Sequence, residues 1–372
     1  MNRRNKNKEL AASHRIASID ALRGLMVLWL IGGRELLNEL LALSPVPVPV
    51  TIRNLTQYTP GSGLQPADLV FPLLLFLSGC AIPLSLERLS LAGKSVAVRI
   101  LRRVTSLVLL QLILNGLLQF KWSSLSLAGP LTIYACGYLF TALLVLRLPR
   151  RFCIPAVAVL VGFWVLILAQ VASRGLLQAN LQTAPLRINW IQPELLDFIF
   201  PTAANGRPLR FGILFAIPAT CMMLSGAITA RWLSDNRSGW SRLSGLIVAA
   251  IVCLSAGISW AGRGDLVPYI WSGPFLLTSI GVCVASLLLA HLLIDLPGQG
   301  AGALFLMVMG RNTIILAITP ALMSFSEISG FLFGGIARLS GELAEVTLIL
   351  GSITIQWLIL LAAFRSRLRF HA

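Results

Sequence analysis

The sequence predicts an all-α integral membrane protein of about ten transmembrane helices, with the N and C termini in the cytoplasm. Hydrophobic residues make up 56% of the 372 residues and charged residues only 12%, whereas a soluble domain carries about 25% charged residues. Apolar stretches of about 20 residues, the length that crosses a bilayer, recur along the whole chain. Lysine and arginine gather in the short segments between these stretches, which is the pattern of cytoplasmic loops.

Each apolar stretch is expected to form one helix of a single polytopic domain that covers residues 1–372, after a basic cytoplasmic N-terminus at 1–17. The expected spans are residues 22–42, 67–86, 104–120, 129–147, 153–172, 211–231, 244–262, 273–294, 303–325 and 343–364. The first span is long, contains Arg23 and Arg34, and has no small-residue cleavage site at its end. We therefore interpret it as a retained helix and not as a signal peptide.

The basic clusters orient these helices. Positive charges follow the second, fourth, sixth and tenth spans, and the connection after the eighth span is an exception, with Asp295 and no basic residue. The positive-inside pattern places these exits in the cytoplasm. A net charge of +16 distributed in this way indicates contact with anionic lipids and not binding of nucleic acid.

Six cysteines lie in or beside apolar segments without a C-x-x-C pair, which is typical of small buried apolar residues. Three histidines leave little material for a histidine-based metal site. We expect no metal site and no bound cofactor.

Two motifs place ionisable groups at the mouths of apolar segments. SIDALRG covers residues 18–24 and contains Asp20 and Arg23, and ADLVFPLLLFLSG covers residues 67–79 and contains Asp68. A charge beside lipid hydrocarbon needs a partner or a watery cavity, so these residues and Arg34 are candidates for a functional site. The structural alternatives are an N-cap for the aspartates and an ion pair between Asp20 and Arg23.

These motifs resemble a known family. SIDALRGLMVLWLIGG, LQPADLVFPLLLFLSGCAIPLSL, PEL at 193–195 and GRNTIILA at 310–317 occur in the same order as in bacterial relatives of the heparan-α-glucosaminide N-acetyltransferases. The resemblance implies a transmembrane acyltransferase that moves an acetyl or other acyl group from cytoplasmic acyl-CoA to a saccharide on the non-cytoplasmic face of the bacterial inner membrane. Acyl-CoA is then a co-substrate, and the saccharide and membrane lipids are the other partners. A homodimer is left open.

The chain departs from the family at two positions. Relatives have a histidine about ten residues before the aspartate of the D-L-x-F-P motif, and here Tyr58 or Gln57 occupies that place. Relatives also have an asparagine or an acidic residue eleven positions after the first-helix arginine, and here that position is Arg34, followed by Glu35. Since a histidine is the usual base for an attacking amine or hydroxyl, the substitution bears directly on the chemistry.

The candidate acceptor site consists of five residues at the outer mouth. Asp68 or Glu35 is expected to act as base or orienting group, Tyr58 and Gln57 as hydrogen-bonding partners, and Arg34 as support for a developing oxyanion. The candidate residues for binding the acyl-CoA are Arg102, Arg103, Arg311 and Asn312. For the basic residues, plain positive-inside anchoring is the alternative.

Two further positions match the family less completely. Glu194 resembles the acid of a P-E-G element, or it is an ordinary first-turn acid of a helix. Trp271 keeps the aromatic of a P-x-N-K-x-x-W motif, or it is an interface anchor. The competing function is a homologue without catalytic activity that serves as a carrier or an assembly component for envelope glycans or lipids.

Overall fold

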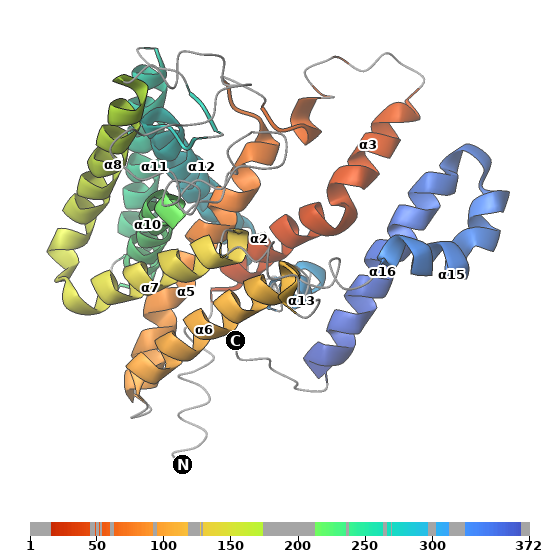
Figure 1. Ribbon diagram of the computed structural model, residues 1–372, viewed down its shortest axis with the longest axis horizontal. Helices are drawn as coiled ribbons and strands as arrows, with labels where there is room; N and C mark the ends of the chain where they lie inside the picture. Colours follow the sequence, from red (N-terminus) through yellow and green to blue (C-terminus); the bar gives the residue numbers. More distant parts are fainter. Residues whose placement is uncertain are drawn as a thin grey trace.

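A computed structural model describes residues 16–44, 49, 52, 54–59, 63–91, 95–117, 127, 129–173, 213–235, 238–262, 266–268, 270–296, 303–311 and 324–365. Every regular element in these ranges is a helix, which confirms the predicted all-α class (Figure 1). The longer elements are α2 (Ala17–Leu28), α3 (Arg34–Ala42), α5 (Val70–Leu91), α6 (Val96–Leu114), α7 (Pro130–Arg147), α8 (Arg150–Ser173), α10 (Ala216–Ser234), α11 (Gly239–Ala261), α12 (Gly273–Ala290), α13 (Leu304–Arg311), α15 (Phe325–Leu339) and α16 (Ala344–Arg365).

Six helical segments of the described chain are long and apolar enough to cross a membrane. They are Pro66–Leu86, Pro130–Arg147, Arg150–Ala169, Gly239–Ala261, Gly273–Asp295 and Gly341–Ala362. Each coincides with an expected span. Of the other expected spans, 22–42, 104–120 and 211–231 fall largely on helices that do not meet the same test by length and composition. The expected span 303–325 lies mostly outside the described residues, and α13 covers only its first part. The total of ten spans and the side of the termini therefore stay predictions.

The first expected span is not one continuous helix. It divides into α2, the π-helical segment η1 (Trp29–Gly33) and α3, and Gly32 inside η1 has a non-helical backbone with φ 158° and ψ −9°. A side chain at Gly32 would press against Ile353 of α16. The residues at the two ends of this span therefore belong to separate helical pieces.

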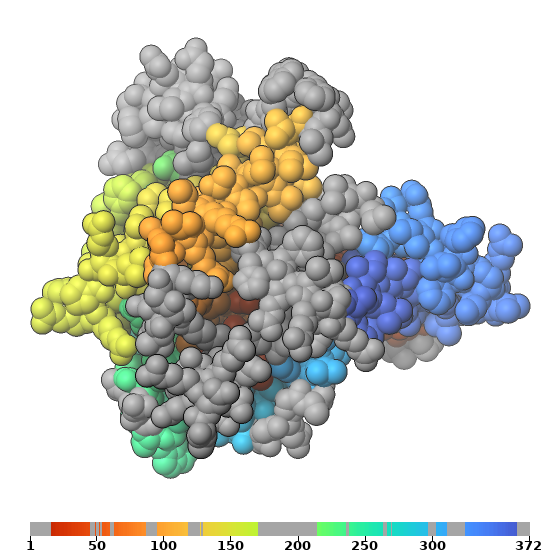
Figure 2. Space-filling view, turned by 90° about the horizontal axis from the view of Figure 1, so that it is seen from below, coloured from red at the N-terminus to blue at the C-terminus, as the bar shows by residue number. Residues whose placement is uncertain are grey.

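The helix α15 was not predicted, because the sequence analysis placed residues 326–342 in a connection between two spans. It forms a hairpin with α16 through the 3-10 turn η8 (Gly341–Leu343). Figure 1 shows this hairpin at one edge of the molecule, and Figure 2 shows it in blue, projecting from the side of the bundle.

The core is centred on α10, which is buried along most of its length against α5, α7 and α8. Its closest neighbour is α5, and glycines on both helices determine how closely the two helix backbones approach. A methyl group at Gly79 would overlap the Met223 carbonyl oxygen, and one at Gly226 would overlap the carbonyl oxygen of Phe76. Such small residues allow the backbones of membrane helices to approach closely.

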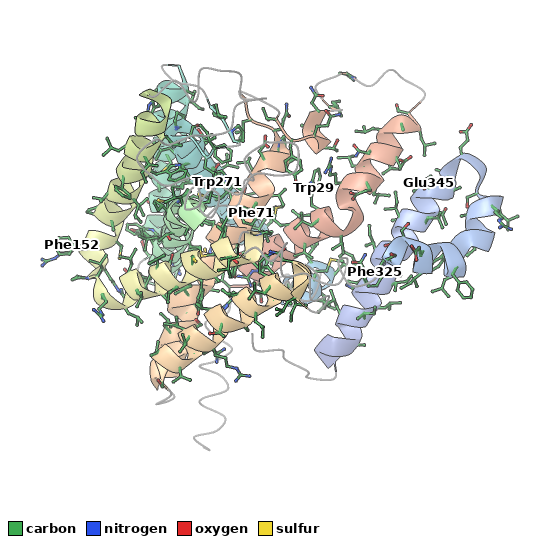
Figure 3. All side chains as sticks on the ribbon, in the orientation of Figure 1. Trp29, Phe71, Phe152, Trp271, Phe325 and Glu345 are labelled. Atoms are coloured by element: carbon green, nitrogen blue, oxygen red, sulfur yellow. The ribbon has the colours of Figure 1, made fainter. Side chains whose placement is uncertain are left out.

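One end of the core, near the start of α12, is an aromatic cluster. Figure 3 shows Phe71 and Trp271 close together, and their ring centroids are 5.9 Å apart in an edge-on arrangement. Trp164 of α8 donates a 2.9 Å hydrogen bond from Nε1 to the carbonyl oxygen of Trp271. Because Trp271 is buried in this cluster, its interpretation as an interface anchor is wrong.

Candidate functional site

Asp68 lies in the 3-10 turn η3 (Pro66–Leu69) that leads into α5, and it is buried. The Thr59 hydroxyl donates a 2.5 Å hydrogen bond to Oδ2, and the Thr59 amide lies 3.3 Å from both carboxylate oxygens. The Gln65 amide donates a further bond of 3.1 Å. Gln65 and Asp68 complete a reciprocal capping box, so the carboxylate connects both Thr59 and Gln65 to the start of the helix.

This arrangement favours the structural interpretation of Asp68. All of its partners named above are hydrogen-bond donors, and each is satisfied by the ionised carboxylate. A general base must reach the proton of the substrate with a free acceptor position. The described geometry instead directs the carboxylate toward its own loop.

Arg34 and Tyr58 are brought together, as the outer-mouth prediction requires. The Arg34 guanidinium lies over the Tyr58 ring, 5.3 Å from its centroid, which is a cation–π contact. Tyr58 follows η2 (Asn54–Thr56) and remains 41% exposed. The contact joins the start of α3 to Tyr58, the residue before the Thr59 that is hydrogen-bonded to Asp68.

Glu35 and Gln57 do not take part in this contact. Both side chains are exposed, and successive residues of a helix point about 100° apart, so Glu35 projects away from the face of Arg34. The prediction that Glu35 supplies the missing acid by a local shift finds no support in this arrangement.

A second group of polar side chains lies inside the bundle, and the sequence analysis identified only its arginines. Arg103 of α6 donates a 3.2 Å hydrogen bond from Nη2 to the Tyr134 hydroxyl, and its guanidinium lies 4.5 Å from the ring centroid of Tyr138. Arg23 of α2 is also within electrostatic range of Tyr134. We call Arg23, Arg103, Tyr134 and Tyr138 the inner basic cluster.

The cluster has more hydrogen-bond donors than acceptors. Arg23 donates a 2.9 Å bond to the Leu77 carbonyl oxygen, and its only ion pair among the described residues is with Asp20, at 3.8 Å. The Nε atoms of Arg23 and Arg103 are both buried and have no hydrogen-bond partner in the described chain. Buried donors without partners are costly, and the cost is greater for charged groups.

An anion would satisfy this cluster. Guanidinium groups bind phosphate and carboxylate oxygens through forked hydrogen bonds, and the Tyr134 hydroxyl adds a neutral donor. The spacing of Tyr134 and Tyr138 places them on one face of α7. Two tyrosines at that spacing in an apolar helix are the signal from which the sequence could have identified this part of the site.

The other candidates for acyl-CoA binding are not drawn into the cluster. Arg102 is exposed on α6, on a different face from its neighbour Arg103. Arg311 ends α13, but its side chain lies outside the described residues, as do Asn312 and Glu194. Of the four predicted residues, Arg103 alone has a described contact with other functional groups.

The SIDALRG motif begins at a capped helix end. Asp295 accepts hydrogen bonds from the amides of Ala17 and Ser18, at 3.0 and 3.3 Å, and one of 2.6 Å from the Ser18 hydroxyl. His291 of η7 (His291–Asp295) contacts the same carboxylate at 2.7 Å. The cap therefore comes from the acidic connection that was the exception to the positive-inside pattern.

No cluster of three or more potential metal ligands occurs among the described residues. All six cysteines are free thiols. Cys80, Cys153, Cys221 and Cys283 are buried, as predicted for small core residues, whereas Cys136 and Cys253 are partly exposed.

Comparison with known proteins adds no family to this description. Neither the protein-family models nor the curated proteins give a match to this sequence. The fold and the apolar helices define the class, an all-helical protein with helices of membrane-spanning length.

Proposed function

We propose that this chain is a membrane-bound acyltransferase of the bacterial inner membrane. It takes an acyl group from cytoplasmic acyl-CoA and transfers it to a saccharide amine or hydroxyl on the other face. The acyl carbon forms a bond to the acceptor nitrogen or oxygen, the C–S bond of the thioester breaks, and the acceptor proton is released while CoA leaves as the thiolate or thiol.

The inner basic cluster is the observation that supports this proposal. Two arginines from separate helices have buried Nε atoms that find no hydrogen-bond partner among the described residues. Ionisable groups inside a membrane protein are costly, and they are typical of substrate pathways. The phosphates of CoA or a developing oxyanion supply the negative charge that the cluster lacks.

The carrier function remains the second candidate, and three observations favour it. Asp68 is hydrogen-bonded to Thr59 and Gln65, Glu35 projects away from Arg34, and Tyr58 or Gln57 stands where the family that the sequence resembles has a histidine. A carrier of an anionic amphiphile needs the basic cluster but no general base. Both functions therefore predict anion binding, and only the acyltransferase predicts turnover.

The test is release of free CoA from acetyl-CoA by the purified protein in nanodiscs, with and without mixed amino sugars. Acetyl-CoA binding is measured in parallel. Arg23→Gln and Arg103→Gln are expected to weaken binding at least tenfold, while Arg147→Gln, at an exposed position at the end of α7, serves as the matched charge control. Tyr58→His tests whether the family base raises the rate.

The outcomes separate the candidates. Turnover that depends on Arg23 and Arg103 supports the acyltransferase. Binding without turnover in the wild type, with turnover restored by Tyr58→His, indicates a scaffold that has lost its base. Absence of both binding and turnover in all variants would overturn the proposal.

A further inference from the structure

The outward face of α15 has a symmetric pattern of residues that does not depend on the proposed function. The helix packs on α16 through its inner face, where Phe325, Ser329 and Ala337 are buried and the Ser329 hydroxyl donates a 2.6 Å bond to the Leu348 carbonyl oxygen. The opposite face is open, and Phe331 is 89% exposed.

Charged residues lie at the two ends of this open face. Glu327 is in the first turn and Arg338 in the last turn, and both are exposed. Their separation of eleven residues is close to three full turns, so they share one face about 16 Å apart along the axis. Neither forms an ion pair with a described residue within its own chain.

Between the charges, a large residue alternates with small ones. Phe331 projects from the face, whereas Gly330, Gly334 and Gly335 have no described atom within 4 Å of the place where a Cβ would lie. We call the depression at Gly334 and Gly335 the glycine notch. Small residues of this kind let two membrane helices approach closely.

The pattern is complementary to itself when two copies of α15 lie antiparallel. In the register that places Glu327 opposite the partner's Arg338, Gly330 lies opposite the partner's Gly335, and Phe331 enters the glycine notch at the partner's Gly334. All three pairs have the same midpoint in the sequence, so a single two-fold axis generates them. A two-fold interface requires such self-complementarity.

The geometry of α15 is compatible with that axis. Two copies of the protein that are inserted in the membrane in the same orientation are related by a two-fold axis along the membrane normal. Such an axis makes a helix antiparallel to its own copy only if that helix lies across the normal. α15 has 15 residues, or about 22 Å, which is shorter than the hydrocarbon core of about 30 Å. In Figure 1, it runs across the direction of the long helices α8 and α11.

We infer that the outward face of α15 is the interface of a two-fold homodimer, with Glu327 paired to the partner's Arg338 and Phe331 in the partner's glycine notch. The occupant is a second copy of this chain, because the two charges complement each other and the pattern is symmetric.

The experiment measures dimer formation in liposomes over a range of protein-to-lipid ratios, by single-molecule photobleaching of labelled full-length protein. Glu327→Arg and Arg338→Glu each convert two attractive pairs into two repulsive ones and are expected to weaken dimerisation about 10- to 100-fold. The double variant Glu327→Arg with Arg338→Glu is expected to restore it to within about threefold. Gly334→Leu fills the notch and is expected to weaken dimerisation without affecting the fold.

Trp240→Ala is the matched control, since Trp240 is a 79% exposed aromatic on α11, outside the interface. Thermal unfolding and size-exclusion profiles report on folding for every variant. A monomeric wild type at all ratios would assign the face to lipid. Dimerisation unaffected by the single reversals and by Gly334→Leu would place the interface elsewhere. Failure of the double reversal to restore dimers would also overturn the inference.

Discussion

The Thr59 hydroxyl donates a 2.5 Å hydrogen bond to Asp68, nine residues later in the chain. This bond and the capping box of Gln65 determine the path of the loop that carries Tyr58 to Arg34. A residue predicted to act as a base is therefore first a structural anchor for the segment beside Tyr58.

The first prediction concerns that cap. Asp68→Asn presents an amide group to donors that need an acceptor, and we expect a loss of about 1–3 kcal/mol in the free energy of unfolding. Thermal unfolding in detergent measures it, with Glu35→Gln, at an exposed position, as the control. If Asp68→Asn abolished turnover while stability stayed unchanged, Asp68 would be the base after all.

The second prediction concerns the contact between α5 and α10. Gly79→Ala and Gly226→Ala place a methyl group on a backbone carbonyl of the other helix, and strain of this kind costs about 1–3 kcal/mol or more. Gly162→Ala on α8 is the matched control, because a Cβ there meets no described atom within 4 Å. We expect the first two variants to lower the melting temperature and the control to leave it unchanged or slightly raised. Equal melting temperatures for all three would contradict the close approach.

The third prediction concerns the cap of α2. Asp295→Asn removes a charged acceptor from two amides and the Ser18 hydroxyl, and we expect it to cost about 1–2 kcal/mol. Hydrogen exchange should show faster opening of the first turn of α2, by mass spectrometry of peptides from that region. Glu345→Gln, an exposed first-turn acid of α16, is the control and should leave exchange at α2 unchanged.

The fourth prediction separates stability from function at the inner basic cluster. Arg103→Met keeps the length of the side chain and removes a charge that has no carboxylate partner among the described residues. We expect stability to be unchanged or to rise, since apolar replacement of buried charges is often neutral or stabilising by about 1–4 kcal/mol. Anion binding should be lost in the same variant, and Arg147→Met should change neither property. A sharp fall in stability would show that Arg103 serves the fold.

The apolar helices were predictable because hydrophobic stretches of the right length and flanking charge carry their own signal. The break in the first span at Gly32 was not predictable, because glycines are common in apolar segments. The kink is seen only in the structure, where Gly32 packs against Ile353. α15 was missed because it is shorter than a span. In the candidate sites, Arg103 was identified by its charge, but its partners Tyr134 and Tyr138 come from another helix and are brought near only by the packing of α6 on α7.

The interruption at η1 also has a mechanical consequence. In an unbroken helix, Arg23 and Arg34 would keep a fixed separation of about 16 Å and a fixed relative direction. The inner piece, α2, is held by Asp295 at one end and by close glycine contact with α13 along its side. The outer piece, α3, leans on α16 and meets the loop through Arg34 and Tyr58. The two ends of one predicted span are therefore held by different neighbours, and α16, which contacts α3, η1 and α13, is the element that connects them.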